Sequence, residues 1–282
     1  MNRSIYSDEQ QNAIRYSNFN KLETDCPFSG FGVKYVVSGE ETYYANNKRY
    51  IVKEGEYIIG NEFTKSTVKI NQKDQVQGLC IDISSQIISE VALYYDLNGS
   101  DLKEFLLSDQ FFVNRYNIKN TSLGYTLNEI NKKIKQGNLM NDLQEKELFY
   151  SLAESVITDQ RFVFNHLGKM DFRKNITNEE VFRALLDAKE FIDEHYIEDL
   201  SLDQICQQAA MSKYHFIRLF KNSFGQSPYQ YLKRIRLEAA KSALHSGKSV
   251  KEIAILLGYA DVPAFSKAFK KIFGYSPGAM SK

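Results

Sequence analysis

The sequence is poor in the residues from which metal sites are built. It contains three cysteines, Cys26, Cys80 and Cys206, and four histidines, of which His166 is the first. The cysteines are odd in number and widely spaced, without the close pairing that a zinc site uses. We therefore expect three buried or inert thiols. A DNA-repair methyltransferase, which uses a reactive cysteine, is the alternative, but its cysteine–zinc pattern is absent.

Long apolar runs are also missing. No apolar stretch approaches the length of a membrane span, and residues 1–20 are polar rather than signal-like. We expect a cytoplasmic protein with no membrane contact. A chain of 282 residues can hold two domains with ordinary cores.

The two ends of the chain differ in charge. The whole sequence has a net charge of +1, but residues 201–282 carry 13 Lys or Arg against 4 Asp or Glu, a net charge of +9. Residues 1–200 carry the remaining 23 Lys or Arg and 31 Asp or Glu, a net charge of −8. A compact basic unit is the electrostatic footprint of a reader of double-stranded DNA. The alternative is a solvated basic face on a helical bundle.

The basic segment contains one motif twice. Seven residues recur in identical relative positions, in Phe216-x-x-x-Phe220-Lys221-x-x-Phe224-Gly225-x-Ser227-Pro228 and in Phe265-x-x-x-Phe269-Lys270-x-x-Phe273-Gly274-x-Ser276-Pro277. Upstream, Ser201 with Gln204 and Ser249 with Glu252 have the spacing of a helix capping box. The copies are offset by 48 residues at the capping boxes and by 49 at the phenylalanines, which places the extra residue in a turn between two helices.

Each copy therefore predicts a helix, a tight turn and a second helix. The phenylalanines form one apolar stripe on the second helix, and lysines and arginine lie on the opposite face. We expect the two helix-turn-helix motifs at about 201–224 and 249–273, with a joining helix at about 228–246. Ser227-Pro228 and Ser276-Pro277 each predict the start of a further helix.

These residues resemble a known family. The segment from about 180 to 282 is similar to the DNA-binding domain of AraC/XylS-type bacterial transcription regulators. The resemblance is carried by Ile205 to Ala209, Ser212-x-x-x-Phe216-x-x-Leu219-Phe220-Lys221, Tyr229 to Ser246, and Ile253-Ala254 through Leu257-Gly258-Tyr259 to Phe265-x-x-x-Phe269-Lys270. The sequence departs from the family at Val262-Pro263, where polar residues are frequent, and at Ala279-Met280-Ser281, where Tyr-Arg is usual.

The resemblance implies that the second helix of each motif lies in a major groove, with the joining helix holding the two about 34 Å apart. It implies base contacts on the first such helix by Tyr214, Ile217 and Arg218, of which Arg218 can donate two hydrogen bonds to guanine. The matching positions on the second are Val262, Pro263, Ser266 and Lys267. Lys213, Lys221, Lys270 and Lys271 are expected to contact phosphates.

The first part of the chain predicts a β domain. Five runs are rich in β-branched and aromatic residues, and they are bounded by the turn pairs Ser38-Gly39, Asn46-Asn47 and Glu54-Gly55. The runs are 32–37, 41–44, 50–52, 57–59 and 76–83. Many short strands indicate a sandwich or barrel. Residues 20–90 resemble the cupin-like sensor domain common in such regulators.

A metal-using cupin needs clustered histidine and carboxylate ligands. No histidine occurs in this region, so a metal would have to be bound by carboxylates such as Glu62 or Asp82 without any imidazole ligand. We therefore expect no metal, no cofactor and no catalytic residues. Tyr35, Tyr44, Tyr57 and Phe63 are candidates to line a small-molecule pocket, or they fill the core.

Two amphipathic segments, at about 122–135 and 143–164, follow the β region. They either close over the barrel or form a dimer contact, and the family resemblance favours a homodimer. We expect an α+β protein of two domains. The N-terminal cupin-like domain, with its two dimerisation-type helices, spans residues 1–167, and a linker follows at 168–177. The all-α domain with two helix-turn-helix motifs spans residues 178–282 and opens with an acidic helix from Asn178 to His195.

Three functions are considered. The first is a sequence-specific regulator, an activator by family habit, that works with RNA polymerase and responds to a small-molecule effector. The second is a regulator controlled by a protein partner, with no ligand in the barrel. The third is a cupin-type enzyme, for which the sequence supplies no metal ligands.

Overall fold

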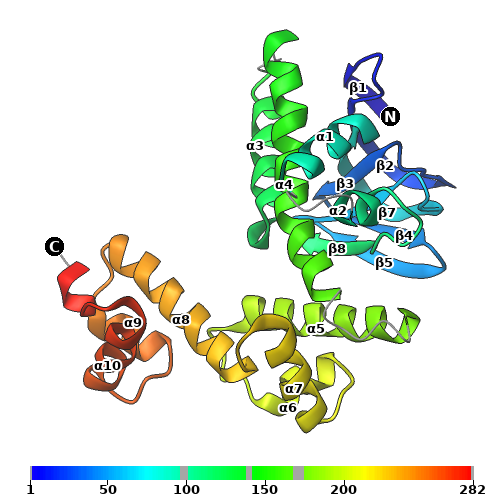
Figure 1. Ribbon diagram of the computed structural model, residues 1–282. Helices are drawn as coiled ribbons and strands as arrows, with labels where there is room; N and C mark the ends of the chain where they lie inside the picture. Colours follow the sequence, from blue (N-terminus) through cyan, green and yellow to red (C-terminus); the bar gives the residue numbers. More distant parts are fainter. Residues whose placement is uncertain (1, 96–100, 138–141, 168–174, 281–282) are drawn as a thin grey trace. The chain divides into compact units, whose positions relative to one another are not determined.

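The computed structural model describes residues 2–95, 101–137, 142–167 and 175–280. The chain divides into two compact units, Met1–Met170 and Asp171–Lys282. The first contains an antiparallel β-sheet with helices, and the second is helical throughout (Figure 1).

The first unit is built on one eight-stranded sheet in which every pairing is antiparallel. The main path runs in the order β1-β2-β7-β3-β6-β8, and β4 pairs with β5 and with β7. The strands are β1 (Asn2–Ser7), β2 (Ala13–Asp25), β3 (Phe31–Ser38), β4 (Glu40–Ala45), β5 (Lys48–Lys53), β6 (Glu56–Asn61), β7 (Ser66–Ile83) and β8 (Asn114–Asn117).

The long strand β7 connects two parts of the sheet. Residues 66–69 pair with β4, and residues 77–83 pair with β3, while β2 follows β7 along both parts. Side chains alternate between the two faces of a strand. Lys34 of β3 and Asp82 of β7 therefore share one face, and Tyr35 of β3 and Tyr57 of β6 share the other, because Tyr35 and Tyr57 lie directly opposite in the register.

The five strand runs expected from the sequence are all strands. Asn46 and Asn47 turn with φ of 47° and 63°, and Gly39 and Gly55 have φ of 85° and 79°, so the three turns are also confirmed. The sequence reasoning missed β1, β2, β8 and the first half of β7. Residues 71–75 of β7 are all exposed and polar, so this stretch lacks the apolar alternation that signals a strand.

The described residues of the first unit also form four α-helices: α1 (Ser85–Tyr95), α2 (Asp101–Leu106), α3 (Ser122–Lys135) and α4 (Asp142–Leu167). The 3-10 helix η1 (Ile118–Asn120) precedes α3. Leu123, Leu127 and Ile130 of α3 share one core with Phe149 and Leu152 of α4 and with the sheet. The apolar stripes expected for these two segments are therefore buried within the unit.

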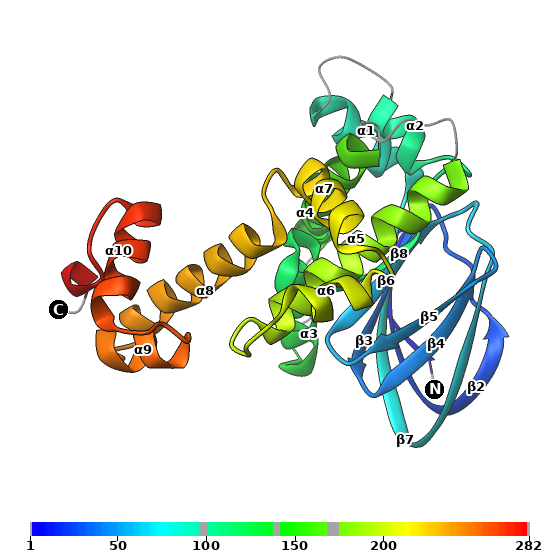
Figure 2. The ribbon, with the colours of Figure 1, turned by 90° about the horizontal axis from the view of Figure 1, so that it is seen from below.

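The second unit consists of α5 (Asn175–His195), α6 (Leu202–Gln208), α7 (Lys213–Phe224), α8 (Pro228–His245), α9 (Val250–Leu256), α10 (Val262–Phe273) and the 3-10 helix η3 (Pro277–Met280). In both ribbon views α8 extends between the pair α6–α7 and the pair α9–α10 (Figures 1 and 2). Each pair has its own apolar core.

Two expectations about this unit were wrong in detail. The acidic helix begins at Asn175 rather than at Asn178, so residues 175–177 of the expected linker are helical. The rest of that linker, residues 168–174, lies outside the described residues. Ser276-Pro277 opens only the short 3-10 helix η3 rather than a full helix. None of the helices in the described part of the chain combines the length and apolar composition that crossing a membrane requires.

Candidate functional sites

The first helix pair is defined by its caps. Ser201 and Gln204 form the expected capping box at the start of α6, with each side chain accepting from the other residue's backbone N–H. Helix α7 ends at Gly225, whose φ of 70° is left-handed. Phe216 and Phe220 of α7 are fully buried, so the orientation of this helix is set by the phenylalanine stripe that the sequence repeats.

The second pair has the same construction. Ser249 and Glu252 form the capping box of α9, and Gly274, with φ of 81°, ends α10. Phe265 and Phe269 are fully buried against Leu237 and Leu244 of α8. The two copies of the motif therefore bury equivalent side chains in separate cores.

The turns within the pairs differ by one residue, as the change of offset predicted. Four residues, 209–212, separate α6 from α7, and five residues, 257–261, separate α9 from α10. Both turns pass through a left-handed residue, Ala210 with φ of 48° and Gly258 with φ of 71°. The start of α10 is capped by Asp261, whose Oδ1 accepts a hydrogen bond from Ala264 N at 2.6 Å. Ser212 makes no side-chain cap at the start of α7.

Helix α7 presents a polar face opposite its phenylalanines. Tyr214 is 78% exposed, Arg218 and Lys221 are exposed, and Ile217 is half-buried. Lys213 is exposed too, but its Nζ lies 2.6 Å from Asp203 Oδ1 of α6, and this ion pair raises the pKa of Lys213. The sequence reasoning did not consider Asp203.

On α10 the expected contact residues are divided. Pro263, Lys267, Lys270 and Lys271 are exposed, and Ser266 is half-buried. Val262 packs against the core of the second pair, so only part of its side chain is accessible. Among the described residues, neither Arg218 nor these three lysines forms an ion pair within the protein.

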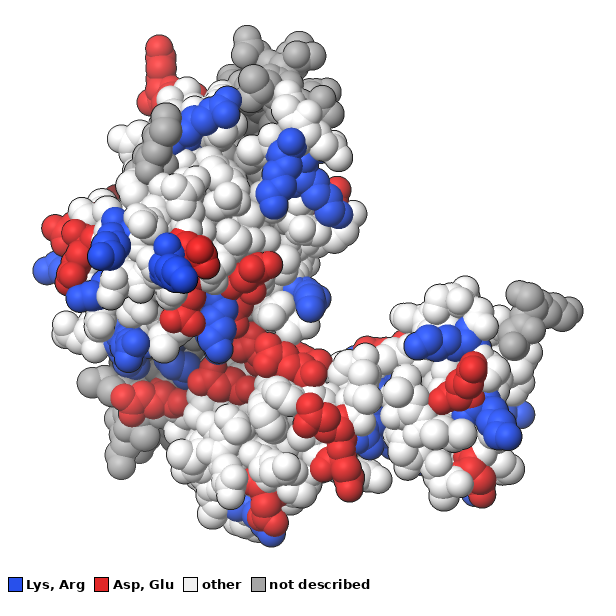
Figure 3. All heavy atoms as spheres, turned by 180° about the vertical axis from the view of Figure 1, so that it is seen from behind, with Lys and Arg blue, Asp and Glu red and all other residues white. Residues whose placement is uncertain are grey.

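Other basic residues of the second unit have internal partners. Arg236 donates to the backbone oxygens of Tyr196 and Glu198, each at 2.7 Å, and Lys241 lies over the ring of Phe273. The electrostatic character reverses around α5, where Asp and Glu side chains gather on the face seen in Figure 3. The exposed cations that form no ion pair among the described residues thus include Arg218 and Lys221 of α7 and Lys267, Lys270 and Lys271 of α10.

In the first unit, the four aromatic candidates do not converge on one site. Tyr35 and Tyr57 are buried, and the Tyr57 hydroxyl donates to Thr121 Oγ1 at 2.9 Å. Burial raises the pKa of both phenols. Tyr44 and Phe63 are 44% and 50% exposed.

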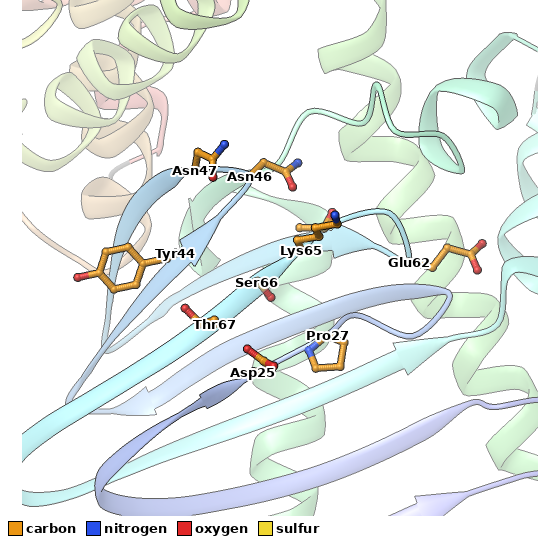
Figure 4. Close-up of a pocket in the computed structure, with 10 residues that line it drawn as sticks. Asp25, Pro27, Tyr44, Asn46, Asn47, Glu62, Lys65, Ser66 and Thr67 are labelled. Carbon is orange, nitrogen blue, oxygen red and sulfur yellow. The ribbon is translucent and has the colours of Figure 1, made fainter.

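Tyr44 lines an open surface depression of about 980 Å³ (Figure 4). Its other lining residues come from the end of β2, the β4–β5 turn and the β6–β7 connection, and they are Asp25, Pro27, Asn46, Asn47, Glu62, Thr64, Lys65, Ser66 and Thr67. Most of these side chains are solvent-exposed.

A charged cluster that the sequence reasoning missed lies inside the first unit. Lys34, Glu41 and Asp82 are only 3%, 4% and 1% exposed. Asp82 bonds to the guanidinium of Arg15 and lies 3.8 Å from Lys34 Nζ, so this carboxylate faces two cations. That environment opposes its use as a metal ligand. A lysine within the apolar run Phe31–Val37 was the available signal.

Comparison with known proteins identifies the second unit. Residues 205–282 match a family model described as a helix-turn-helix domain. The chain is 26% identical over 253 residues to the raffinose operon transcriptional regulatory protein RafR of Pediococcus pentosaceus, covering 89% of this chain and 84% of RafR. It is 36% identical over 89 residues to the bifunctional transcriptional activator/DNA repair enzyme AdaA of Bacillus subtilis, covering 31% of this chain and 42% of AdaA.

Among solved structures, the C-terminal domain of AraT from Geobacillus stearothermophilus is 32% identical, covers 35% of this chain and 83% of its own, and aligns with a TM-score of 0.33. The family match over residues 205–282, the sequence relatives and the capped helix pairs define a DNA-binding transcriptional regulator. The chain belongs to the AraC/XylS family of these regulators.

Proposed function

We propose that this regulator reads promoter DNA with α7 and α10, each placed in a major groove. The observation that supports the proposal is the equivalence of the two helices, since each buries a phenylalanine stripe and exposes a basic face. Basic residues on one face of a helix pair attract phosphates, and side chains at the start of the second helix reach base edges.

The proposed base contacts are Tyr214, Ile217 and Arg218 on α7 and Pro263, Ser266 and Lys267 on α10, with a smaller contribution from the half-buried Val262. Lys221, Lys270 and Lys271 are proposed to contact phosphates. Lys213 would do so only in competition with Asp203. Arg218 has the greatest capacity for specific reading because a guanidinium can donate two hydrogen bonds to guanine.

The first unit is proposed to be a cupin-like sensor that responds to a small molecule and joins two copies of the chain. Its paired strands and the buried charged cluster support a sensor role. Dimerisation would use the outer side of α3, where Tyr125 is 70% exposed. We propose that the protein acts in the cytoplasm as an activator that contacts RNA polymerase.

Control by a protein partner is the second candidate. The burial of Tyr35 and Tyr57 favours it, because these side chains fill the core rather than face a ligand. A partner would then act on the outer surface of α3 and α4, and small molecules would not change DNA binding.

Selection of binding sites from a random DNA library, with the full-length protein at two salt concentrations, tests the proposal. We expect one asymmetric motif spanning about two helical turns of DNA. Arg218→Ala combined with Lys267→Ala should abolish enrichment, whereas Lys73→Ala, a change at an exposed residue of β7, should not. Specific retention by the double variant would refute the assigned contacts, and retention that is weak, sequence-independent and lost at higher salt would mean that phosphates alone are bound.

A further inference from the structure

The two helix pairs are joined by α8, which contributes to both cores but is less buried between them. Tyr231 and Leu232 lie in the core of the first pair, and Leu237 is the first residue of α8 in the core of the second. Residues 233–236, between these two stretches, are only half-buried. Each pair is thus held against its own stretch of α8, and bending of the half-buried stretch would change the orientation of α7 relative to α10.

Arg236 ties the middle of α8 to the end of α5. Its Nε donates to Tyr196 O and its Nη2 donates to Glu198 O, each at 2.7 Å. These oxygens lie just beyond the last residue of α5, at the end of the helix where carbonyl groups lack intrahelical partners and the helix dipole is negative. A guanidinium presents its donors in a rigid planar fork, so the two bonds fix both the position and the direction of this backbone.

The side chain of Tyr196 lies between the two helix pairs. Among the described residues, it is the one hydrophobic side chain that packs against the core of the first pair and also against the core of the second. Helix α5 belongs to the first core through Leu185, Ala188 and Ile192. Because Arg236 holds the backbone of Tyr196, these contacts connect the two pairs by a second route besides α8 itself.

The second pair also approaches Arg236. Tyr259 lies in the turn between α9 and α10, and its ring is 5.4 Å from that of Phe265, centroid to centroid. Burial raises the pKa of Tyr259, and the positive charge of Arg236 opposes that rise, as expected when the guanidinium lies beside this turn. Nearer the first pair, the Tyr231 hydroxyl donates to Asp193 Oδ1 at 2.6 Å and holds α5 against α8.

We propose that Arg236 is a positioning residue that couples the two helix-turn-helix motifs, by holding Tyr196 between their cores so that α7 and α10 meet DNA at one spacing and orientation. This inference rests on the two-groove reading proposed above. A fixed connection raises the effective concentration of the second motif at a DNA site with the matching spacing, and lowers it at other spacings. Arg236 therefore selects the distance between half-sites rather than the bases within them.

Fluorescence anisotropy with the full-length protein and its selected operator tests this coupling. The operator is compared with a version that carries two extra base pairs between the half-sites, which turn the second half-site by about 70°. The unaltered protein should bind the lengthened operator about tenfold or more weaker than the original. Arg236→Gln should bind the original operator about tenfold weaker than the unaltered protein does, and the lengthened operator nearly as well as the original, because the motifs are no longer held at one spacing.

Two further variants separate positioning from charge. A lysine keeps the charge but lacks the planar fork, so Arg236→Lys should restore part of the preference for the original spacing. Arg234→Gln removes the same charge, but Arg234 pairs with Glu238 of the same helix at 2.7 Å, so the spacing preference should remain. An operator with one scrambled half-site should bind Arg236→Gln and the unaltered protein alike, since each motif stays folded. A spacing preference in Arg236→Gln equal to that of the unaltered protein would overturn the assignment.

A distance measurement without DNA keeps this inference separate from the proposed function. Nitroxide labels are attached through a genetically encoded ketone amino acid in place of Asn222 of α7 and Lys271 of α10, which are both exposed. Double electron–electron resonance should give one narrow distance distribution for the unaltered protein and for Arg234→Gln, and a broader one for Arg236→Gln, or for Arg236→Lys if the glutamine variant does not fold. An equally narrow distribution in the Arg236 variant would overturn the positioning role. Absence of a spacing preference in the unaltered protein would instead refute the two-groove reading.

Discussion

Ala210 and Gly258 occupy the same position in the two helix pairs, and both have a left-handed backbone, with φ of 48° and 71°. Glycine adopts this conformation without strain because it has no Cβ, whereas alanine does not. The turn geometry is therefore kept in both copies of the motif, although the residue that favours it is present in only one.

Exchange of these two residues should have opposite effects on stability. Gly258→Ala should lower the free energy of unfolding by about 1 kcal/mol, because a Cβ is strained at positive φ. No atom within 4 Å would meet that Cβ, so the effect should come from the backbone alone. Ala210→Gly should raise the free energy of unfolding by up to about 1 kcal/mol, because it removes a Cβ from a left-handed backbone position.

Urea unfolding of the full-length chain measures both changes. Gly278→Ala is the control, since Gly278 also has open space around it and does not adopt a left-handed φ. If Gly278→Ala lowered the free energy of unfolding as much as Gly258→Ala, the left-handed turn would not be the cause of the destabilisation.

Arg218 and Lys221 should have separable effects on DNA binding. Arg218→Ala should reduce affinity for the selected operator by about 1–3 kcal/mol and relax the sequence preference at one position. Lys221→Ala should weaken binding to all sequences alike and reduce the slope of log affinity against log salt by about 1. Fluorescence anisotropy with matched and mismatched duplexes at several salt concentrations distinguishes the two patterns, and identical effects of the two variants would contradict the assigned roles.

Asp261 should weaken DNA binding while it stabilises α10. Its carboxylate caps the helix, but it also places a negative charge at the helix end proposed to approach DNA. Asp261→Asn keeps a capping oxygen and removes the charge, so the unfolding midpoint should change little and operator affinity should increase at low salt.

Asp261→Ala is the comparison, because it removes the cap as well and should cost about 1 kcal/mol of stability. Thermal unfolding of both variants measures the change in stability, and fluorescence anisotropy measures the change in operator affinity. Unchanged affinity in Asp261→Asn at low salt would place the start of α10 away from the phosphates.

The two capping boxes should differ in their response to acid. Hydrogen bonds from the Ser249 backbone and hydroxyl lower the pKa of Glu252 below its usual value of 4.5, whereas Gln204 in the equivalent box does not titrate. A lowered pKa in the folded state stabilises the fold above the unfolded pKa, and this contribution is lost as the pH falls through the folded value.

The backbone amides of α9 should therefore lose protection from hydrogen exchange below about pH 4.5, more than the amides of α6 do. Glu252→Gln should remove the difference between the two helices. Equal acid sensitivity of α9 with and without Glu252 would assign the effect to another group.

Cys26 should be an unreactive thiol. Burial raises the pKa of Cys26 to about 11, and the opposing effect of Lys34 is smaller. At pH 8 the folded protein should be alkylated at Cys26 about two orders of magnitude more slowly than the unfolded chain, because the thiolate is the reacting species. Mass spectrometry after timed iodoacetamide treatment measures this, and rapid labelling of the folded protein would show that the thiol is solvent-accessible.

The helix pairs show how far local sequence can define structure. Ser201 with Gln204, and Ser249 with Glu252, cap their helices as their spacing predicts, because a capping box needs only residues three apart. The phenylalanine stripes also fixed which faces of α7 and α10 are buried. The lysines and Arg218 on the opposite faces followed from the same period.

The first unit shows what local sequence could not decide. The exposed polar stretch of β7 lies between two segments that pair with β2, residues 67–71 and 76–82, and these long-range contacts carry no local signal. Strand alternation places neighbouring residues such as Lys34 and Tyr35 on opposite faces of β3, but it does not reveal which face holds charged partners.

The sequence by itself determined the two capped helix pairs, their basic faces and the family to which the chain belongs, since these depend on residues close together along the chain. Only the tertiary structure decided that Lys34 and Asp82 meet in the core of the first unit, and that Lys213 is paired with Asp203. Those contacts join residues on different strands or helices, and their proximity comes from folding rather than from spacing.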